Sequence, residues 1–333
     1  MKVLFLTYYT CIRAIKEMIA LQKAGVNVFL LQTGNKNIEF NTMFGWTMFY
    51  NANEVDTLRY QLGRITGIDV IHCHNEPSWI VSVAKECCPD IPVVFDTHDL
   101  FTARDGKPNQ VERQTFQDCD AVVTPSKGYK QHIIDFYGLQ KPIEVIYSYC
   151  NENMYFDRYP DKNKQSFPGI VYEGGIAKEP DSYRYYVDVV RNSIGRGIPF
   201  NIYPAATGIA KIYQDAGANV MAGMSYFDLI PAMSRFEWGF VGPGFKHRAF
   251  DWSMPNKLFE YLAAGIPLVV YESQEALEFV KEHGIGIEFK DNAIKDKDVR
   301  EMYAGIVREK RFTMESQSSK LIALYESLAN EKV

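Results

Sequence analysis

Short apolar runs alternate with helix-length segments through both halves of the chain, and this alternation limits the fold more than any other feature. The predicted strands of the first half are Val3–Thr7, Val26–Gln32, Trp46–Tyr50, Asp69–Cys73, Pro92–Asp96, Ala121–Thr124 and Ile143–Tyr147. Those of the second half are Gly169–Glu173, Pro199–Tyr203, Asn219–Ala222, Trp238–Val241, Pro267–Tyr271 and Ile285–Phe289. Strands separated by helical crossovers predict right-handed βαβ units and parallel sheets. We therefore expect an α/β protein with two doubly wound domains.

Chain length and one polar segment set the expected domain boundaries. A chain of 333 residues exceeds the size at which a single hydrophobic core usually stops growing. Residues 151–168 are polar and charged and contain no predicted strand, which is typical of a linker. We expect one domain over residues 1–150 and a second over 169–312. A final amphipathic helix is predicted within residues 313–333.

Composition excludes several classes of protein. A net charge of −5 argues against a nucleic-acid partner, because nucleic-acid binding relies on a basic surface. We find no stretch of the ~20 apolar residues needed to span a bilayer. Arg13, Lys16 and Glu17 interrupt the N-terminus before a signal-peptide core is complete. The six cysteines show no disulfide spacing, and Cys87 and Cys88 are adjacent, so we expect reduced thiols and a cytoplasmic protein.

The segment Ser253–Tyr271 combines a helix start suited to an anion with a buried strand. Pro255 fits the first turn of a helix, and Lys257 follows where the unpaired N–H groups and the helix dipole already favour phosphate. Glu260 lies one turn further on the same face, and Gly265 can end the helix in a left-handed conformation. A lysine for phosphate and a carboxylate for ribose hydroxyls would suit a nucleotide diphosphate. An exposed ion pair between Lys257 and Glu260 is the alternative interpretation.

This segment resembles the donor-nucleotide motif of GT-B glycosyltransferases, particularly those of family four. The matching residues are Pro255, Lys257, Glu260, Tyr261, Ala263, Gly265 and Pro267, with Leu268 in place of a valine. Three further segments resemble family motifs in the expected order: Val93–Leu100, Cys119–Gly138 and Gly169–Lys178. The resemblance implies two Rossmann-like domains that face a central cleft. It also implies that the C-terminal helix packs back on the N-terminal domain.

The resemblance divides the substrates between the domains, with the acceptor on the first and the nucleotide sugar on the second. Expected donor-binding residues are Gly174, Gly175, Lys178, Met254, Pro255, Asn256, Lys257 and Glu260. Gly174 and Gly175 would let the backbone approach a phosphate, although a tight strand-to-helix turn explains the pair equally well. Lys257 would also act in catalysis by stabilising the departing diphosphate.

His98 and Asp99 follow the predicted strand Pro92–Asp96 and are the other expected catalytic residues. In the family's matching loop a histidine contacts the donor sugar or stabilises the reacting centre; a histidine that only caps the loop is the alternative. Asp99 would serve as a general base if the reaction inverted the anomeric carbon. The family-four resemblance instead implies retention, which needs no such base. Asp96 is interpreted as structural.

The acceptor side is expected to contain Arg13, His74, Asn75 and Glu76. His72 and His74 share one face of a strand and suggest a metal, but the sequence offers no third ligand at a fitting distance. Two Asp-x-Asp triplets, at residues 118–120 and 296–298, are assigned to a helix end and a charged loop. We therefore expect no metal.

These observations predict a glycosyltransferase of the hexosyl type that moves a sugar from a UDP-linked donor to a hydroxyl. The acceptor would be a saccharide or a lipid-linked saccharide, with retention, no metal and no cofactor besides the nucleotide-sugar co-substrate. A lipid-linked acceptor would add weak peripheral contact with the inner face of the membrane. Two alternatives stay open. Trp252 replaces a glutamate common in the family, which allows a catalytically silent nucleotide-sugar-binding protein, and a nucleotide-sugar 2-epimerase needs carboxylates that we cannot place.

Overall fold

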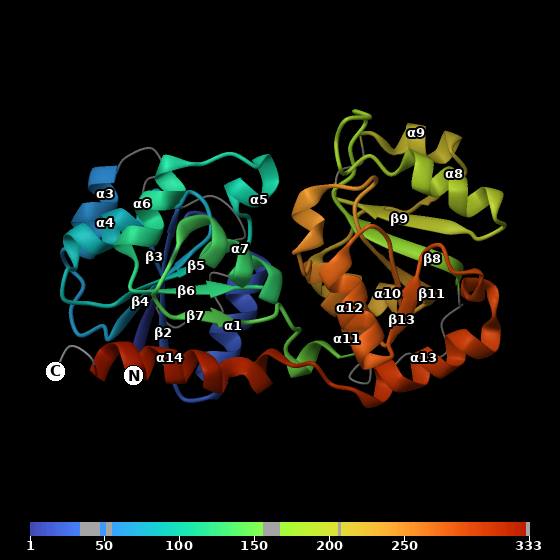
Figure 1. Cartoon of the computed structure of the whole chain (residues 1–333). Coiled ribbons are helices and arrows are strands. Elements are labelled where there is room, and N and C mark those ends of the chain that lie inside the picture. The colour runs from blue at the N-terminus through green and yellow to red at the C-terminus, as the bar shows by residue number, and fades with distance from the viewer. Residues whose placement is uncertain (34–46, 51–54, 156–166, 206–207, 331–333) are drawn as a thin grey trace. The chain divides into compact units, whose positions relative to one another are not determined.

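The chain divides into two compact units (Figure 1). The computed structural model describes residues 1–33, 47–50, 55–155, 167–205 and 208–330. The first unit contains Met1–Asn151 and Met314–Val333, and the second contains Glu152–Thr313. Of the segment predicted as a linker, residues 156–166 lie outside the described residues. Within the described part of the chain, no helix is both long and apolar enough to cross a membrane.

The first unit is built on a seven-stranded parallel sheet. Its strands are β1 (Lys2–Thr7), β2 (Asn27–Thr33), β3 (Thr47–Tyr50), β4 (Val70–His74), β5 (Val93–Asp96), β6 (Ala121–Thr124) and β7 (Ile143–Val145). They are arranged in the order β3-β2-β1-β4-β5-β6-β7, and every pairing between neighbours is parallel. The order reverses direction between β1 and β4, as in doubly wound nucleotide-binding folds.

Helices connect these strands and complete the unit. They are α1 (Ile12–Lys23), α3 (Val55–Leu62), α4 (Trp79–Cys87), α5 (Phe101–Asp105), α6 (Gln110–Asp118) and α7 (Lys127–Tyr137). The C-terminal helix α14 (Ser318–Asn330) also belongs to this unit and contacts α1 and β7. Just before it, the Gln317 amide bonds to both the N–H and the carbonyl of Tyr147, at 2.9 and 2.7 Å. Tyr325 of α14 hydrogen-bonds to Nδ1 of His72.

The second unit repeats the plan with six parallel strands. These are β8 (Phe167–Gly174), β9 (Phe200–Pro204), β10 (Asn219–Val220), β11 (Phe236–Val241), β12 (Leu268–Val270) and β13 (Gly286–Glu288), in the order β10-β9-β8-β11-β12-β13. Its helices are α8 (Val187–Gly195), α9 (Ala210–Asp215), α10 (Tyr226–Met233), α11 (Asn256–Ala263), α12 (Gln274–His283) and α13 (Lys297–Glu309). The strand order again reverses, here between β8 and β11. The predicted α/β fold with two doubly wound domains is confirmed.

Helix α11 packs unusually close to the second sheet. A Cβ added to Gly239 of β11 would lie 2.3 Å from the ring of Tyr261, so only glycine allows this approach. The phenol of Tyr261 in turn accepts a hydrogen bond from the N–H of Glu173 at 3.0 Å. Gly265 ends the helix with φ of 75°, the left-handed conformation predicted for it. These contacts hold α11 against β8 and β11.

One predicted loop is a helix. Residues 296–298 were assigned to a charged loop, but Asp296 is the N-cap of α13. Its Oδ1 accepts hydrogen bonds from the N–H groups of Asp298 and Val299, at 2.8 and 3.3 Å. A capping aspartate satisfies N–H groups that the first helical turn leaves unpaired. The capping aspartate is a short-range signal that the sequence itself contains.

Candidate active site

The carboxyl end of β8 brings a lysine against a glycine. Gly174, the last residue of the strand, has φ of 119°, and a Cβ there would lie 3.3 Å from Nζ of Lys257. Lys257 comes from the first turn of α11, and its ammonium also lies 4.0 Å from the ring centroid of Tyr172. An anion at this point would meet a fixed cation and the N–H groups of a helix N-terminus together. These are the elements of a phosphate site.

A second cation lies at the neighbouring glycine, and sequence reasoning missed it. A Cβ on Gly175 would lie 3.2 Å from Nη1 of Arg184. Arg184 is exposed and its guanidinium packs over the ring of Tyr183, at 5.4 Å from the centroid. Lys178, the basic residue predicted for this position, has a 68 % exposed side chain that lies 3.9 Å from Glu179. No spacing rule links Arg184 to the glycine pair, so only the folded turn reveals their proximity.

Glu260 is held inside the second unit by a tyrosine. Its side chain is 4 % exposed, and Oε1 accepts a hydrogen bond of 2.9 Å from the hydroxyl of Tyr226 on α10. The exposed ion pair with Lys257 that we left open is therefore not what this glutamate forms. Tyr226 was not predicted, because α10 is separated from α11 by a strand and a long loop.

The other predicted donor residues lie at the same helix start. Pro255 is the N-cap of α11, one position before the place predicted for it, and Asn256 is the first helical residue. Met254, which precedes this turn, is buried and only 3 % exposed. Met254, Pro255 and Asn256, all expected to bind the donor, are thus consecutive residues at the N-terminus of α11.

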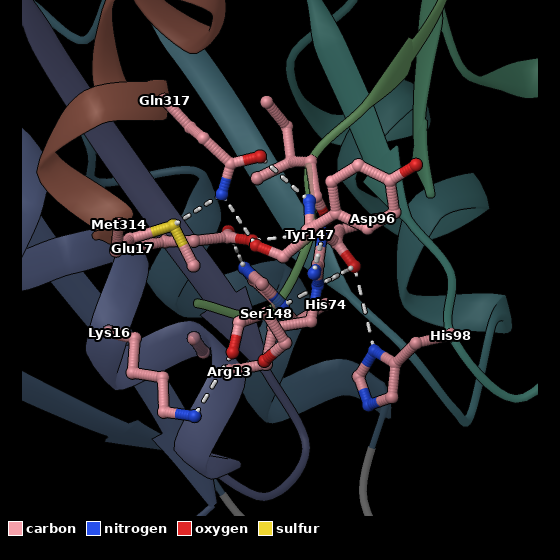
Figure 2. Close-up of polar contacts among 12 residues, drawn as sticks. Arg13, Lys16, Glu17, His74, Asp96, His98, Tyr147, Ser148, Met314 and Gln317 are labelled. Carbon is pink, nitrogen blue, oxygen red and sulfur yellow. Dashed lines mark hydrogen bonds and ion pairs between the residues drawn. The ribbon is translucent and has the colours of Figure 1, made fainter. Parts of the chain in front are cut away.

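In the first unit, a buried ion-pair network lies beneath the carboxyl ends of the central strands (Figure 2). Arg13 of α1 donates from Nε to both carboxylate oxygens of Asp96, at 3.0 and 3.1 Å, and from Nη2 at 2.8 Å. Nη2 also lies 3.0 Å from Glu17, and Nη1 donates to the carbonyl of Ile146 at 2.7 Å. Arg13 is 1 % exposed, so the side chain expected to face the acceptor is instead buried against two carboxylates.

Two stacked histidines of β4 complete the network. Their rings are 4.7 Å apart, and Nε2 of His74 lies 3.2 Å from Glu17. Burial favours neutral His74, but the nearby carboxylates of Asp96 and Glu17 outweigh it and raise the pKa of His74 to about 9. Burial lowers the pKa of His72, the ring that hydrogen-bonds to Tyr325. His74 therefore lies beneath the predicted acceptor side, as a buried cation 2 % exposed.

We expect no metal because the sequence offers no third ligand beside His72 and His74, but the structure does bring further ligand types to these histidines. Glu17 and Asp96 supply the carboxylates that the sequence did not reveal beside His72 and His74, and atoms from the four residues lie within 4.8 Å of one another. Such residue types bind zinc in many proteins. Here, however, the guanidinium of Arg13 already contacts both carboxylates, and a protonated His74 supplies the second positive charge. The two buried negative charges are balanced within the chain, so a metal-free network stays our prediction.

His98 lies at the solvent edge of this network. Its Nδ1 is 3.5 Å from Oδ1 of Asp96, and its side chain is 18 % exposed. Burial opposes the charged form, but Asp96 and Cys11 raise the pKa of His98 well above its usual value. These neighbours favour the imidazolium form of His98, which can donate but not accept a proton. Asp99 is much more exposed than His98, at 58 % of its side chain. Its carboxylate lies 3.9 Å from Nε2 of His98.

Asn75 joins the loops that follow β4 and β5. It has a positive φ of 53°, and its amide donates to Asp99 at 3.0 Å and accepts from the N–H of His98 at 3.4 Å. Glu76 lies 3.6 Å from Arg104, and burial raises the pKa of its carboxyl. The structure therefore brings Asn75, His98 and Asp99 together at one rim of the first sheet, with Glu76 beside them.

Two Rossmann-type domains in one chain, each with polar residues at its topological switch point, define the class of GT-B proteins. Residues 19–151 match the family model described as Glycosyltransferase Family 4. The resemblance noted from the sequence is thereby confirmed for the first domain. The motif around Lys257 and Glu260 lies outside the matched residues. No curated protein sequence matches the chain.

Solved structures of the same fold extend over both domains. A glycosyltransferase from Rickettsia africae ESF-5 has a TM-score of 0.73 at 11 % identity, over 98 % of each chain. Sucrose-phosphate synthase from Thermosynechococcus elongatus has 0.71 at 12 %, again over 98 % of each. UDP-GlcNAc 2-epimerase from Neisseria meningitidis, bound to UDP-GlcNAc, has 0.59 at 13 %, over 98 % of this chain and 99 % of that one. At such identities the likeness establishes the fold.

Proposed function

We propose that this protein transfers a sugar from a nucleotide-diphosphate sugar, with UDP as the expected nucleotide, to a hydroxyl of a saccharide or lipid-linked saccharide. The observation that carries the proposal is the ammonium of Lys257 against Gly174, at the N-terminus of α11. Arg184 beside Gly175 adds a second positive charge to the same turn. The diphosphate would lie between these cations, and Glu260, held by Tyr226, would bind the nucleoside.

The chemistry we propose needs little more than positioned charge. The bond between the anomeric carbon and the β-phosphate oxygen breaks, and a new bond forms from the same carbon to the acceptor oxygen. With retention, the acceptor hydroxyl passes its proton to the departing phosphate oxygen, so no protein base takes part. Lys257, Arg184 and the α11 N–H groups would stabilise the negative charge on that leaving group, a contribution that preorganised donors commonly make.

His98 would support the sugar in this scheme. As an imidazolium paired with Asp96, it can donate a hydrogen bond to a sugar hydroxyl or a phosphate oxygen. Asp99 is the better candidate for a base, because it is exposed and acts as an acceptor. If Asp99 acts as a base, the reaction inverts the anomeric carbon, and if His98 only supports the sugar, the reaction retains it. The configuration of the product therefore tests the proposal.

A donor screen tests the proposal. Thermal unfolding would be followed with UDP-, GDP-, ADP- and dTDP-sugars at concentrations well above the expected dissociation constants. A ligand that binds only the folded protein raises the midpoint in proportion to the logarithm of its concentration. We expect the largest rise with UDP-sugars. If none of the four classes moves the midpoint, the donor site is wrong.

Trp252 favours a second candidate, a nucleotide-sugar-binding protein without turnover. The indole stands where many family members have a glutamate, and Arg248 packs over it at 5.7 Å from the ring. Such a protein would bind the donor and release no nucleotide with any acceptor. An epimerase, the activity named for the Neisseria structure, would return an isomer of the donor sugar. Chromatography of the products therefore separates transfer, binding alone and epimerisation.

A further inference from the structure

Tyr172 of β8 contacts both parts of the phosphate site described above. Its ring faces the ammonium of Lys257, and the Nζ atom lies 4.0 Å from the ring centroid. Its hydroxyl donates a hydrogen bond of 2.7 Å to the carbonyl of Gly175, in the turn that follows the strand. A single side chain therefore connects the cation of α11 with the glycine turn, which we define as Gly174 and Gly175.

The ring of Tyr172 is itself held in place. The side chain is buried, and its ring centroid lies 4.3 Å from that of Tyr186. The hydroxyl of Tyr186 donates to the carbonyl of Gly242 at 3.1 Å, which anchors this second ring to the residue after β11. Burial raises the pKa of Tyr172, so its phenol keeps its proton and stays a donor. The surface that the ammonium contacts is thus fixed by packing.

The groups beside this ring have polar atoms without partners inside the protein. Lys257 is half-buried, and within the described part of the chain its ammonium is paired with no carboxylate and no hydrogen-bond acceptor. Among the same residues, the N–H groups of Gly175 and Ile176 have no acceptor. Successive N–H groups in a turn form concave sites for anions. A cation and two such donors at one turn are groups that a phosphate can satisfy.

We propose that Tyr172 is a positioning residue for the donor diphosphate, because its ring holds the ammonium of Lys257 at the glycine turn and its hydroxyl fixes the carbonyl of Gly175. This role rests on the proposed function, since it belongs to the same site. A lysine side chain is flexible, and ordering it on binding costs conformational entropy. A ring that already holds the ammonium reduces that cost and so raises the affinity for phosphate.

The test measures binding of UDP and of uridine to the folded full chain by isothermal titration. Tyr172→Leu removes the ring and the hydroxyl, and should weaken UDP binding about tenfold, within the range for a partly desolvated cation over an aromatic face. Tyr172→Phe keeps the ring and loses only one hydrogen bond, so the loss should be about threefold or less. Uridine has no phosphate, and its affinity should stay at the wild-type value in both variants. A general loss of structure would instead weaken both ligands.

Tyr155 provides the matched control in the same unit. It is a buried tyrosine whose hydroxyl donates to the carbonyl of Phe312 at 2.7 Å, and the guanidinium of Arg311 lies 5.1 Å from its ring centroid. These are the same kinds of contact, made to a different segment of the chain. Tyr155→Leu and Tyr155→Phe should therefore leave UDP affinity unchanged.

A double variant tests whether Tyr172 acts through Lys257. Residues that act as a unit are not additive, so Tyr172→Leu should cost about threefold or less in UDP affinity when Lys257→Ala is already present. A full tenfold loss in that background would overturn the proposal.

Should Tyr172→Leu fail to fold, fluorinated phenylalanines at position 172 keep the question open to measurement. Each added fluorine weakens the negative face of the ring and changes its shape little, so UDP affinity should fall stepwise along the series. Constant affinity would show that the ring does not hold the cation. Rising affinity would show that the ring competes with phosphate for the ammonium, and either result would overturn the proposal.

These outcomes are distinct from failure of the proposed function. UDP affinity that falls in Lys257→Ala but not in Tyr172→Leu would refute the role of Tyr172 and leave the donor site in place. UDP binding that depends on Tyr172 as expected, in a protein that transfers no sugar to any acceptor, would support the role of Tyr172 and contradict glycosyl transfer.

Discussion

The role of an individual side chain in this protein depends on the residues that contact it in the folded state. Lys257 was selected from a motif, and the structure shows its ammonium at the glycine turn of β8. Arg184 has no motif and lies at the neighbouring glycine. Arg13 looked like an acceptor-facing charge, yet its guanidinium is buried against Asp96, 83 positions away in sequence. Sequence spacing reports neighbours within one helix but not such distant partners.

Lys257→Ala should weaken binding of UDP by ~1.5–3 kcal/mol, the range for a hydrogen bond to a charged group. Glu260→Gln should instead reduce affinity for the nucleoside portion, with uridine as the probe. Isothermal titration measures both. The matched control is Lys211→Ala, which removes an exposed lysine of the same unit that pairs with Asp215, and should leave affinity unchanged. If both the Lys257 and Glu260 variants bind with wild-type affinity, the assignment of the donor-nucleotide site to these residues is wrong.

His98→Ala should lower turnover on the order of 10²-fold, as loss of one preorganised donor does, and leave UDP affinity nearly intact. UDP lacks the sugar that His98 would contact. Asp99→Asn should change turnover little if the reaction retains configuration. A loss of ~10²–10⁴-fold in Asp99→Asn is instead the behaviour of a general base. Initial rates with a saturating donor distinguish these outcomes.

At the scale of elements, the alternation of strands and helices was enough to predict two parallel sheets. The strand order could not be predicted, because apolar runs do not reveal which strands are neighbours. The helix α13 was missed although its N-cap aspartate was present, and the short helix α5 was not predicted. In the site, the start of α11 was predictable from local motifs. The network around Arg13 joins α1, β4, β5 and α14, and depends on tertiary packing that periodicity does not encode.

The buried network makes stability depend on pH. The pKa of His74 rises from about 6.5 in the unfolded chain to about 9 in the folded one. The folded state therefore binds this proton more tightly. Its contribution to the free energy of unfolding is complete below pH 6.5 and is lost as pH rises through 9.

His74→Gln should accordingly destabilise the protein most near pH 6, and the difference from wild type should shrink towards pH 9. The thermal midpoints of both proteins at pH 6, 7.5 and 9 provide the comparison. Each midpoint difference is taken between two proteins in the same buffer, so general effects of pH cancel. A difference that stays constant, or grows with pH, would show that His74 does not hold a proton in the folded state.

For the whole molecule, the proposed mechanism requires that protein groups, and no metal ion, neutralise the leaving diphosphate. Transfer should survive excess EDTA, because Lys257, Arg184 and a helix N-terminus would neutralise the leaving diphosphate. The cluster of Glu17, His72, His74 and Asp96 makes this prediction sharper, since it contains metal-binding residue types. Metal analysis of the purified protein is the control. Activity lost on chelation and restored by manganese or magnesium would refute the metal-free mechanism.

The most direct test of the central claim is proton NMR of a reaction that contains the protein, the best-bound UDP-sugar from the donor screen and a saccharide acceptor. The account predicts release of UDP together with a new anomeric signal of the same configuration as the donor, and loss of both with Lys257→Ala. An inverted anomer would contradict retention and give Asp99 the role of base. A donor that binds but is unchanged with every acceptor would contradict glycosyl transfer itself.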